Sequence, residues 1–182
     1  MGRKRIGIIY RGGKGWIGGV YYIQNVISAL NTLCDQDKPL IDVYSDSEQS
    51  FDDLVNITRY PYLVFVKLKE NKLLLFLRKL CKPISYNLWL RIPYFSFKKE
   101  DMFVFPFMQG DPKHLLPWIP DFQDKHLPEM FDKKILKGRD RQNKYISEHF
   151  KHLVLSSHDC ENDLKVFYPN FRCQIHVMHF AV

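Results

Sequence analysis

The sequence predicts an α/β protein with a doubly wound, Rossmann-like parallel β-sheet and helices on both of its faces. Apolar runs of strand length alternate with amphipathic or capped helical segments along the whole chain, which is the order of elements in a parallel α/β sheet. The first run, residues 5–10, is almost continuously apolar, as is typical of a strand buried on both faces. The length of 182 residues suits one domain with its own core, so we expect residues 1–182 to form a single domain around a single sheet.

Each element follows from a local pattern. The strands are expected at residues 5–10, 40–44, 62–68, 101–107, 115–119, 152–155 and 174–179. The helices are expected at about residues 20–33, 50–58, 72–82, 132–149 and 159–167, with a helical turn opened by Pro128. Ser50 and Asp132 are the expected N-terminal caps of two of these helices. Residues 84–99 give no clear pattern, and residues 120–123 predict a loop.

The chain is basic, with a formal net charge of +7 and a pI of about 9.2, so its surface should attract anions. No block of five or six like charges forms a basic arm, so we expect phosphorylated small molecules or anionic lipid, and not nucleic acid, as partners. No apolar run approaches the ~20 residues that a membrane span needs, and the basic residues 3–5 lead directly into a strand instead of a signal peptide core. We therefore expect a cytoplasmic protein, with peripheral contact to the inner face of a membrane left open.

A glycine-rich loop follows the first expected strand. Gly13, Gly15 and Gly18 match the G-x-G-x-x-G spacing of dinucleotide-binding loops, between a strand and a helix as that site requires. Glycines allow backbone N–H groups to approach a phosphate closely, and the following helix adds its positive end. Gly15, Trp16, Gly18 and Gly19 are therefore the expected contacts to a sugar nucleotide or an acceptor.

Two other interpretations of this loop stay open. It could bind a dinucleotide, with Asp42 or Asp46 near the second strand as the ribose ligand. It could also be a flexible turn whose small residues only pack the strand against the helix. The glycine pairs at 12–13 and 18–19 surround the bulky Trp16 and make the loop longer than a tight phosphate-binding turn, which counts against the dinucleotide.

Several stretches resemble the N-terminal domain of family 4 glycosyltransferases, which have the GT-B fold. The most specific stretch is Trp118-Ile-Pro-Asp-Phe-Gln-Asp-Lys-His-Leu-Pro-Glu-Met-Phe131. The resemblance continues in three later stretches: Arg139-Asp140, Leu153-Val-Leu-Ser-Ser157 and Asp163-Leu-Lys-Val-Phe-Tyr-Pro169. The opening strand with its Gly-Gly loop is also similar to the start of these enzymes. The resemblance covers both ends of the chain and is poor for residues 50–100.

The resemblance implies transfer of a sugar from a nucleotide-sugar to an acceptor hydroxyl, in the biosynthesis of a polysaccharide, a glycolipid or another glycan. The nucleotide-sugar is a co-substrate, and the family implies no cofactor and no obligatory metal. The N-terminal domain of such enzymes shapes the site of the glycan or lipid-linked acceptor, and the Gly-Gly loop, here Gly18 and Gly19, approaches the donor diphosphate. The C-terminal domain that grips the nucleotide is absent from this sequence, so we expect residues 1–182 alone to be inactive.

The histidines give no metal site of their own. The pairs His149/His152 and His176/His179 lack an acidic partner in a ligand pattern, and we expect them at the surface or at strand ends.

Asp121 is the expected catalytic residue. It follows the expected strand 115–119, at the edge where a parallel sheet exposes its functional groups, and a carboxylate there can take or orient the proton of an acceptor hydroxyl. Many members of the family have a histidine at the place of Pro120, so no histidine role is assigned at that position. Asp124 and His126 are the rivals of Asp121, and His126 can titrate near neutral pH. The alternative is that Asp121 only caps the next helical turn or holds its own loop.

Two further functions stay open. One is a complete dinucleotide-binding module, and the other is a non-catalytic subunit that docks a two-chain transferase on a membrane. Between Lys67 and Lys99, basic residues interleave with apolar and aromatic ones, and such a segment can lie at an anionic membrane surface. The competing interpretation is that the apolar residues 73–77 belong to the core and that the lysines form a solvated rim.

Overall fold

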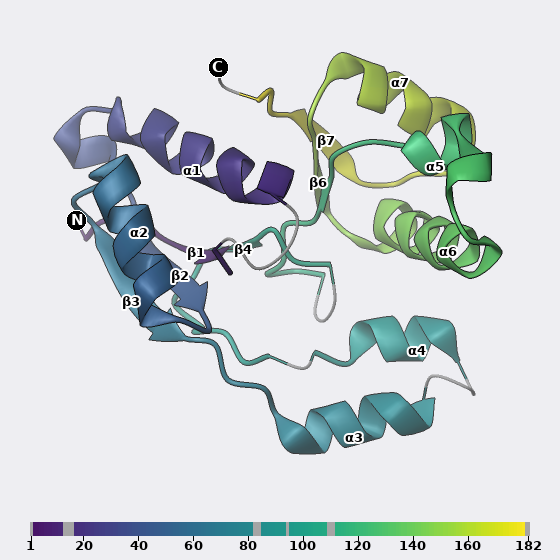
Figure 1. Cartoon of the computed structure of the whole chain (residues 1–182), viewed down its shortest axis with the longest axis horizontal. Coiled ribbons are helices and arrows are strands. Elements are labelled where there is room, and N and C mark those ends of the chain that lie inside the picture. Colours follow the sequence, from purple (N-terminus) through teal and green to yellow (C-terminus); the bar gives the residue numbers. More distant parts are fainter. Residues whose placement is uncertain (1, 13–16, 82–84, 94, 109–111, 181–182) are drawn as a thin grey trace. The chain divides into compact units, whose positions relative to one another are not determined.

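The computed structural model describes residues 2–12, 17–81, 85–93, 95–108 and 112–180 (Figure 1). It confirms the predicted class, because parallel β-sheets flanked by helices make up the fold. The chain divides into two compact units. The first unit comprises Met1–Leu75, Tyr94–Phe105 and Phe180–Val182, and the second comprises Phe76–Pro93 and Pro106–His179.

The first unit contains a four-stranded parallel sheet in the order β3-β2-β1-β4. Its strands are β1 (Arg5–Ile9), β2 (Leu40–Ser45), β3 (Leu63–Lys67) and β4 (Val104–Phe105). The helices α1 (Ile17–Asn31) and α2 (Glu48–Thr58) connect β1 to β2 and β2 to β3, and they pack against each other. A short 3₁₀ turn, Asp35–Asp37, precedes β2. The apolar side chains of Ile8, Ile27 and Val43 are buried in this unit, as the continuous apolar runs predict.

Gly7 lies where β1 passes closest to its neighbours in the sheet. A Cβ atom at Gly7 would lie 2.8 Å from the ring of Tyr44 on β2 and 2.9 Å from Val104 on β4. Both of these side chains are buried. Only a glycine therefore allows the strand to run beside Tyr44 without displacing a packed ring.

The second unit contains a three-stranded parallel sheet in the order β5-β6-β7. Its strands are β5 (Trp118–Ile119), β6 (His152–Leu155) and β7 (Gln174–Val177). Helices α4 (Tyr86–Arg91), α5 (Gln123–His126), α6 (Lys133–His149) and α7 (His158–Phe167) belong to it, with a 3₁₀ turn at Pro128–Met130. Helix α3 (Lys72–Cys81) begins in the last residues of the first unit's N-terminal segment and continues into the second unit.

The expectation of a single sheet is wrong for the described residues, because the strands form two separate hydrogen-bonded ladders. The reason lies in the two shortest strands. Of the predicted strand 101–107 only Val104 and Phe105 form β4, and of 115–119 only Trp118 and Ile119 form β5. Pro106 follows β4 directly and Pro117 precedes β5 directly, and a proline has no N–H with which to extend a ladder.

The helix ends also differ in detail from the sequence prediction. Ser47, and not Ser50, caps α2: the Ser47 hydroxyl accepts a hydrogen bond from the Ser50 backbone N–H at 3.3 Å. Asp132 stands at the cap of α6 as expected, but its side chain makes no capping hydrogen bond. The predicted loop 120–123 leads at Gln123 into α5, a single turn too short to carry a periodic signal.

Candidate functional site

The glycine-rich loop joins β1 to α1 in the first unit. Gly15 and Trp16, two of its expected contact residues, lie outside the described residues. Helix α1 begins at Ile17, earlier than predicted, so Gly18 and Gly19 belong to its first turn. That turn contains no acidic residue, and its positive end is therefore not neutralised by a carboxylate of its own.

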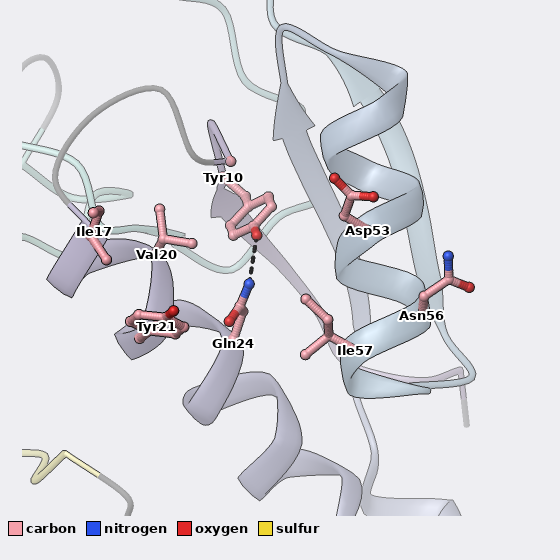
Figure 2. A pocket seen from close by; sticks show the side chains of 9 residues that line it. Tyr10, Ile17, Val20, Tyr21, Gln24, Asp53, Asn56 and Ile57 are labelled. Atoms are coloured by element: carbon pink, nitrogen blue, oxygen red, sulfur yellow. Dashed lines mark hydrogen bonds between the residues drawn. The ribbon is translucent and has the colours of Figure 1, made fainter.

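A pocket of about 500 Å³ lies beside this helix start, between α1 and α2 (Figure 2). Tyr10, which follows β1, forms its buried floor, and the Gln24 side-chain amide donates a hydrogen bond to the Tyr10 hydroxyl at 2.9 Å. Apolar side chains from both helices line the walls. The exposed ones are Ile17 and Tyr21 on α1 and Ile57 on α2, and the half-buried Val20 of α1 lies beside them.

Polar groups stand at the α2 side of the same pocket. Asp53 and Asn56 line it together with Ile57, as Figure 2 shows. A carboxylate accepts hydrogen bonds, and an amide both donates and accepts them. An aromatic ring, aliphatic side chains and these two polar groups together suit a small ligand that has both an apolar face and hydroxyl groups.

Asp42, one of the two expected ribose ligands, lies in the middle of β2 with its side chain fully buried. Arg5 donates hydrogen bonds to it from Nε and Nη2, and Lys98 Nζ lies 2.8 Å from Asp42 Oδ1. The expectation for Asp42 is therefore wrong, because its carboxylate is used by the core and faces no ligand. Asp46, the other expected ribose ligand, follows the carboxyl end of β2 and is exposed.

Asp101 completes this buried cluster and has a different protonation behaviour. Tyr44 donates its hydroxyl hydrogen to Asp101 Oδ2. Burial, and next the neighbouring Asp42 carboxylate, raise the pKa of Asp101 to about 6. Burial opposes ionisation of Asp42 as well, but the hydrogen bonds from Arg5 and Lys98 outweigh it and lower the pKa of Asp42 below its ordinary value. Below about pH 6, the cluster therefore favours a charged Asp42 and a protonated Asp101.

Replacing Asp101 by Asn should remove a pH dependence of stability. The pKa of Asp101 is higher in the folded than in the unfolded protein, so binding of a proton to Asp101 stabilises the fold. This stabilisation is complete below the ordinary pKa of 3.8 and is lost as the pH rises through about 6. Between about pH 4 and about pH 7 we expect the wild type to lose roughly 1–3 kcal/mol of unfolding free energy relative to Asp101→Asn. Urea denaturation of both proteins across this range measures the difference, and parallel stability curves would contradict the assignment.

The second unit contains the expected catalytic residue. Asp121 lies two residues beyond β5, at the carboxyl end of that strand. The Trp118 indole N–H donates to the Ser156 hydroxyl at 2.9 Å, and the Cys160 thiol donates to the Pro120 carbonyl at 3.0 Å, so both sides of the loop are fixed. The Asp121 side chain remains 34% exposed.

Arg139 on α6 holds Asp121 and was not expected as a site residue. Its Nη2 donates to Asp121 Oδ1 at 3.0 Å. Its Nε lies 3.0 Å from Oδ1 of the buried Asp124, although these atoms are not aligned for a hydrogen bond. The backbone N–H of Gln123 also donates to Asp121 Oδ1, at 3.2 Å, so the expected loop-holding contact exists as well. The sequence shows an Arg139-Asp140 motif but no sign of which carboxylate it meets.

His126 has other partners. It ends α5, and its Nε2 lies 2.8 Å from Asp163 Oδ2 on α7, with the edge of its ring against Phe167. Next to it, Lys125 donates to Asp140, and this hydrogen bond holds the pKa of Asp140 below its usual range. The structure thus gives Asp121 and His126 separate partners, Arg139 and Asp163. Both lie in the second unit, whereas Gly18 and Gly19 lie in the first.

The described ranges contain neither a cluster of metal-binding side chains nor a helix that could span a membrane. No group of three or more His, Cys, Asp or Glu side chains there is placed to hold a metal ion. No helix in those ranges is both long enough and apolar enough to cross a membrane.

Comparisons with known proteins leave the chain without a relative on which to base a function. No protein-family model matches the sequence, and neither the curated proteins nor the solved structures contain a match.

Proposed function

We propose that this chain is the acceptor-side domain of a glycosyltransferase with the GT-B fold. The enzyme would transfer a sugar from a nucleotide-sugar to an acceptor hydroxyl, in the biosynthesis of a polysaccharide, a glycolipid or another glycan. The resemblance of residues 118–131 and of the later segments to family 4 glycosyltransferases motivates the proposal. The observation that carries it is the position of Asp121, which is part-exposed after β5 and held by Arg139.

The chemistry of the transfer assigns a role to this carboxylate. An acceptor hydroxyl must lose its proton as the new sugar–oxygen bond forms, and a carboxylate within hydrogen-bond reach can accept or orient that proton. The hydrogen bonds from Gln123 and Arg139 both use Asp121 Oδ1. They orient the carboxyl group, and Oδ2 is the oxygen that we assign to the acceptor hydroxyl.

The pocket between α1 and α2 supports binding of a sugar ring by the first unit. Its volume of about 500 Å³ lies within the range of small-molecule sites. A pyranose ring has an apolar face for the Tyr21 ring and hydroxyl groups for Asp53 and Asn56. The first turn of α1, which carries no acidic residue, suits the diphosphate of the donor.

We also propose that the enzyme works as a peripheral protein at a membrane surface, where lipid-linked acceptors are found. The net charge of +7 supports this location, because the cytoplasmic leaflet carries anionic lipids.

The proposal is tested by a transfer assay with the complete gene product. A panel of labelled nucleotide-sugars is offered with candidate glycan and lipid-linked acceptors, and label should appear in the acceptor with one class of donor. A protein that hydrolyses or transfers no nucleotide-sugar, while binding NAD or NADP, would favour the dinucleotide alternative.

The dinucleotide alternative has its own readout. Under this alternative, NAD or NADP would bind tightly and quench the intrinsic tryptophan fluorescence of residues 1–182. Asp46→Ala would then abolish the quenching, because Asp46 is the exposed one of the two candidate acids. We expect no saturable quenching, since the other candidate acid, Asp42, is enclosed by Arg5 and Lys98.

A further inference from the structure

Helix α3 exposes an apolar face. Four apolar residues lie on one side of this helix, because they follow one another at steps of three, one and three residues. They are Leu73, Phe76, Leu77 and Leu80. Their exposed fractions are 66%, 58%, 39% and 51%. The interpretation of residues 73–77 as core is therefore wrong for Leu73, Phe76 and Leu77, whereas Leu74 and Leu75 are half-buried. The helix of ten residues is left with one apolar side in solvent.

The opposite side of α3 explains why this face is turned outward. Arg78 is buried, although it is a charged residue in the middle of the helix. Its Nη1 donates hydrogen bonds to the backbone carbonyls of Trp89, at 3.0 Å, and Ile92, at 2.7 Å. Its guanidinium group also lies 4.2 Å from the centroid of the Trp89 ring. The side of α3 that carries Arg78, together with the half-buried Leu74 and Leu75, is thereby fixed against α4, and the exposed apolar residues lie on the other side of the helix.

Basic residues precede α3 and lie along one edge of its apolar face, and the exposed Glu70 is the one acidic residue among them. Lys67 and Lys69 precede α3, and Lys72 and Lys79 lie on it; all four are exposed. The helix itself contains no acidic residue. An apolar stripe bordered by cations is complementary to a surface with an apolar interior and anionic groups at its boundary.

We infer that α3 is the element by which this chain docks on an anionic lipid bilayer. The apolar face, defined by Leu73, Phe76, Leu77 and Leu80, enters the boundary between headgroups and acyl chains, and the lysines contact the anionic headgroups. Ten residues span only ~15 Å as a helix, about half of the hydrocarbon thickness, so α3 lies in the plane of the interface. The inference deepens the proposed peripheral location and does not depend on the transferase reaction.

Sedimentation with lipid vesicles tests this inference on residues 1–182. The probes are vesicles of phosphatidylcholine alone and of phosphatidylcholine mixed with phosphatidylserine. We expect binding to the mixed vesicles only, weakening as the salt concentration rises from about 0.1 M to about 1 M. Phe76→Ser should weaken the binding about tenfold through lost apolar contact. Lys72→Gln and Lys79→Gln should each weaken it by about fivefold.

A matched variant separates docking from a general loss of apolar surface. Val166 on α7 is as exposed as Leu73, so Val166→Ser should bind the mixed vesicles as the wild type does. Unchanged circular dichroism of Phe76→Ser keeps the comparison valid, because the exposed Phe76 side chain does not contribute to a core. Equal binding to both kinds of vesicle, or binding to neither, would overturn the inference. Self-association abolished by Phe76→Ser, without vesicle binding, would overturn it in favour of a protein partner. None of these readouts depends on the transfer assay.

Discussion

Replacing Asp121 by Asn in the complete enzyme should lower kcat by about 10²–10⁴, the usual contribution of a positioned acid or base. The amide keeps the shape of the side chain and can still accept the hydrogen bonds that Gln123 and Arg139 donate to Oδ1. It cannot take a proton from the acceptor hydroxyl. The KM for the nucleotide-sugar and the Tm should therefore change little, and steady-state kinetics together with a thermal melt measure both.

Two variants serve as controls for this prediction. Asp132→Asn alters an exposed carboxylate nearby that makes no capping hydrogen bond, so kcat and Tm should both stay at the wild-type level. Arg139→Gln should lower kcat and also destabilise the fold, because it removes the cation beside the buried Asp124. A near-normal kcat in Asp121→Asn, or a loss of Tm alone, would make Asp121 a structural residue. A large loss of kcat in His126→Gln would then identify His126 as the base.

Replacing Arg5 by Met should destabilise the first unit by about 2–3 kcal/mol. Removing one partner of a buried ion pair typically costs about 3–5 kcal/mol, because the other charge stays buried without compensation. Arg5 is part-exposed, and Lys98 still contacts Asp42 in the variant, so we expect a smaller value than the full range. Urea denaturation measures the loss. The loss should shrink as the pH falls. The pKa of Asp42 is lowered in the folded state, so the stabilisation from its ion pairs is present at neutral pH and disappears when Asp42 becomes protonated at low pH.

Arg3 provides the comparison for this second prediction. It stands two residues earlier and pairs with Asp35, whose side chain is exposed. Exposed ion pairs contribute little to stability, so Arg3→Met should cause a clearly smaller loss than Arg5→Met. Equal losses in the two variants would show that burial of Asp42 has no special role.

The sequence by itself determined the class of the fold and the position of most elements. The apolar run of β1, the three-and-four spacing along α1, the boundaries of β6 and the start of β7 were all predictable, because each depends on residues that are neighbours in the chain. It could not show that the strands divide into two ladders. Whether Val104 and Trp118 belong to one ladder depends on backbone groups far apart in sequence. The effect of the neighbouring prolines on strand length can be judged only once the strand pairing is known.

The candidate site shows the same division. Motif and spacing indicated Asp121, but only the tertiary structure brought Arg139, eighteen residues later, to its carboxylate. The sequence offered Asp42 as a ligand residue, and the fold buried it with Arg5 and Lys98, which lie 37 and 56 residues away. Local patterns record the preferences of single segments, whereas burial and ion pairing are decided by which segments meet.

Helix α3 is the case in which sequence and structure contributed equally. The leucines and lysines after residue 67 predicted a basic, leucine-rich helix but left open whether its apolar residues belong to the core or to the surface. Periodicity defines the two sides of a helix and does not say which side is covered. The tertiary structure decided this through Arg78, because its hydrogen bonds to the carbonyls of Trp89 and Ile92 fix the side of α3 that carries Arg78 inward and leave the opposite, apolar side in solvent.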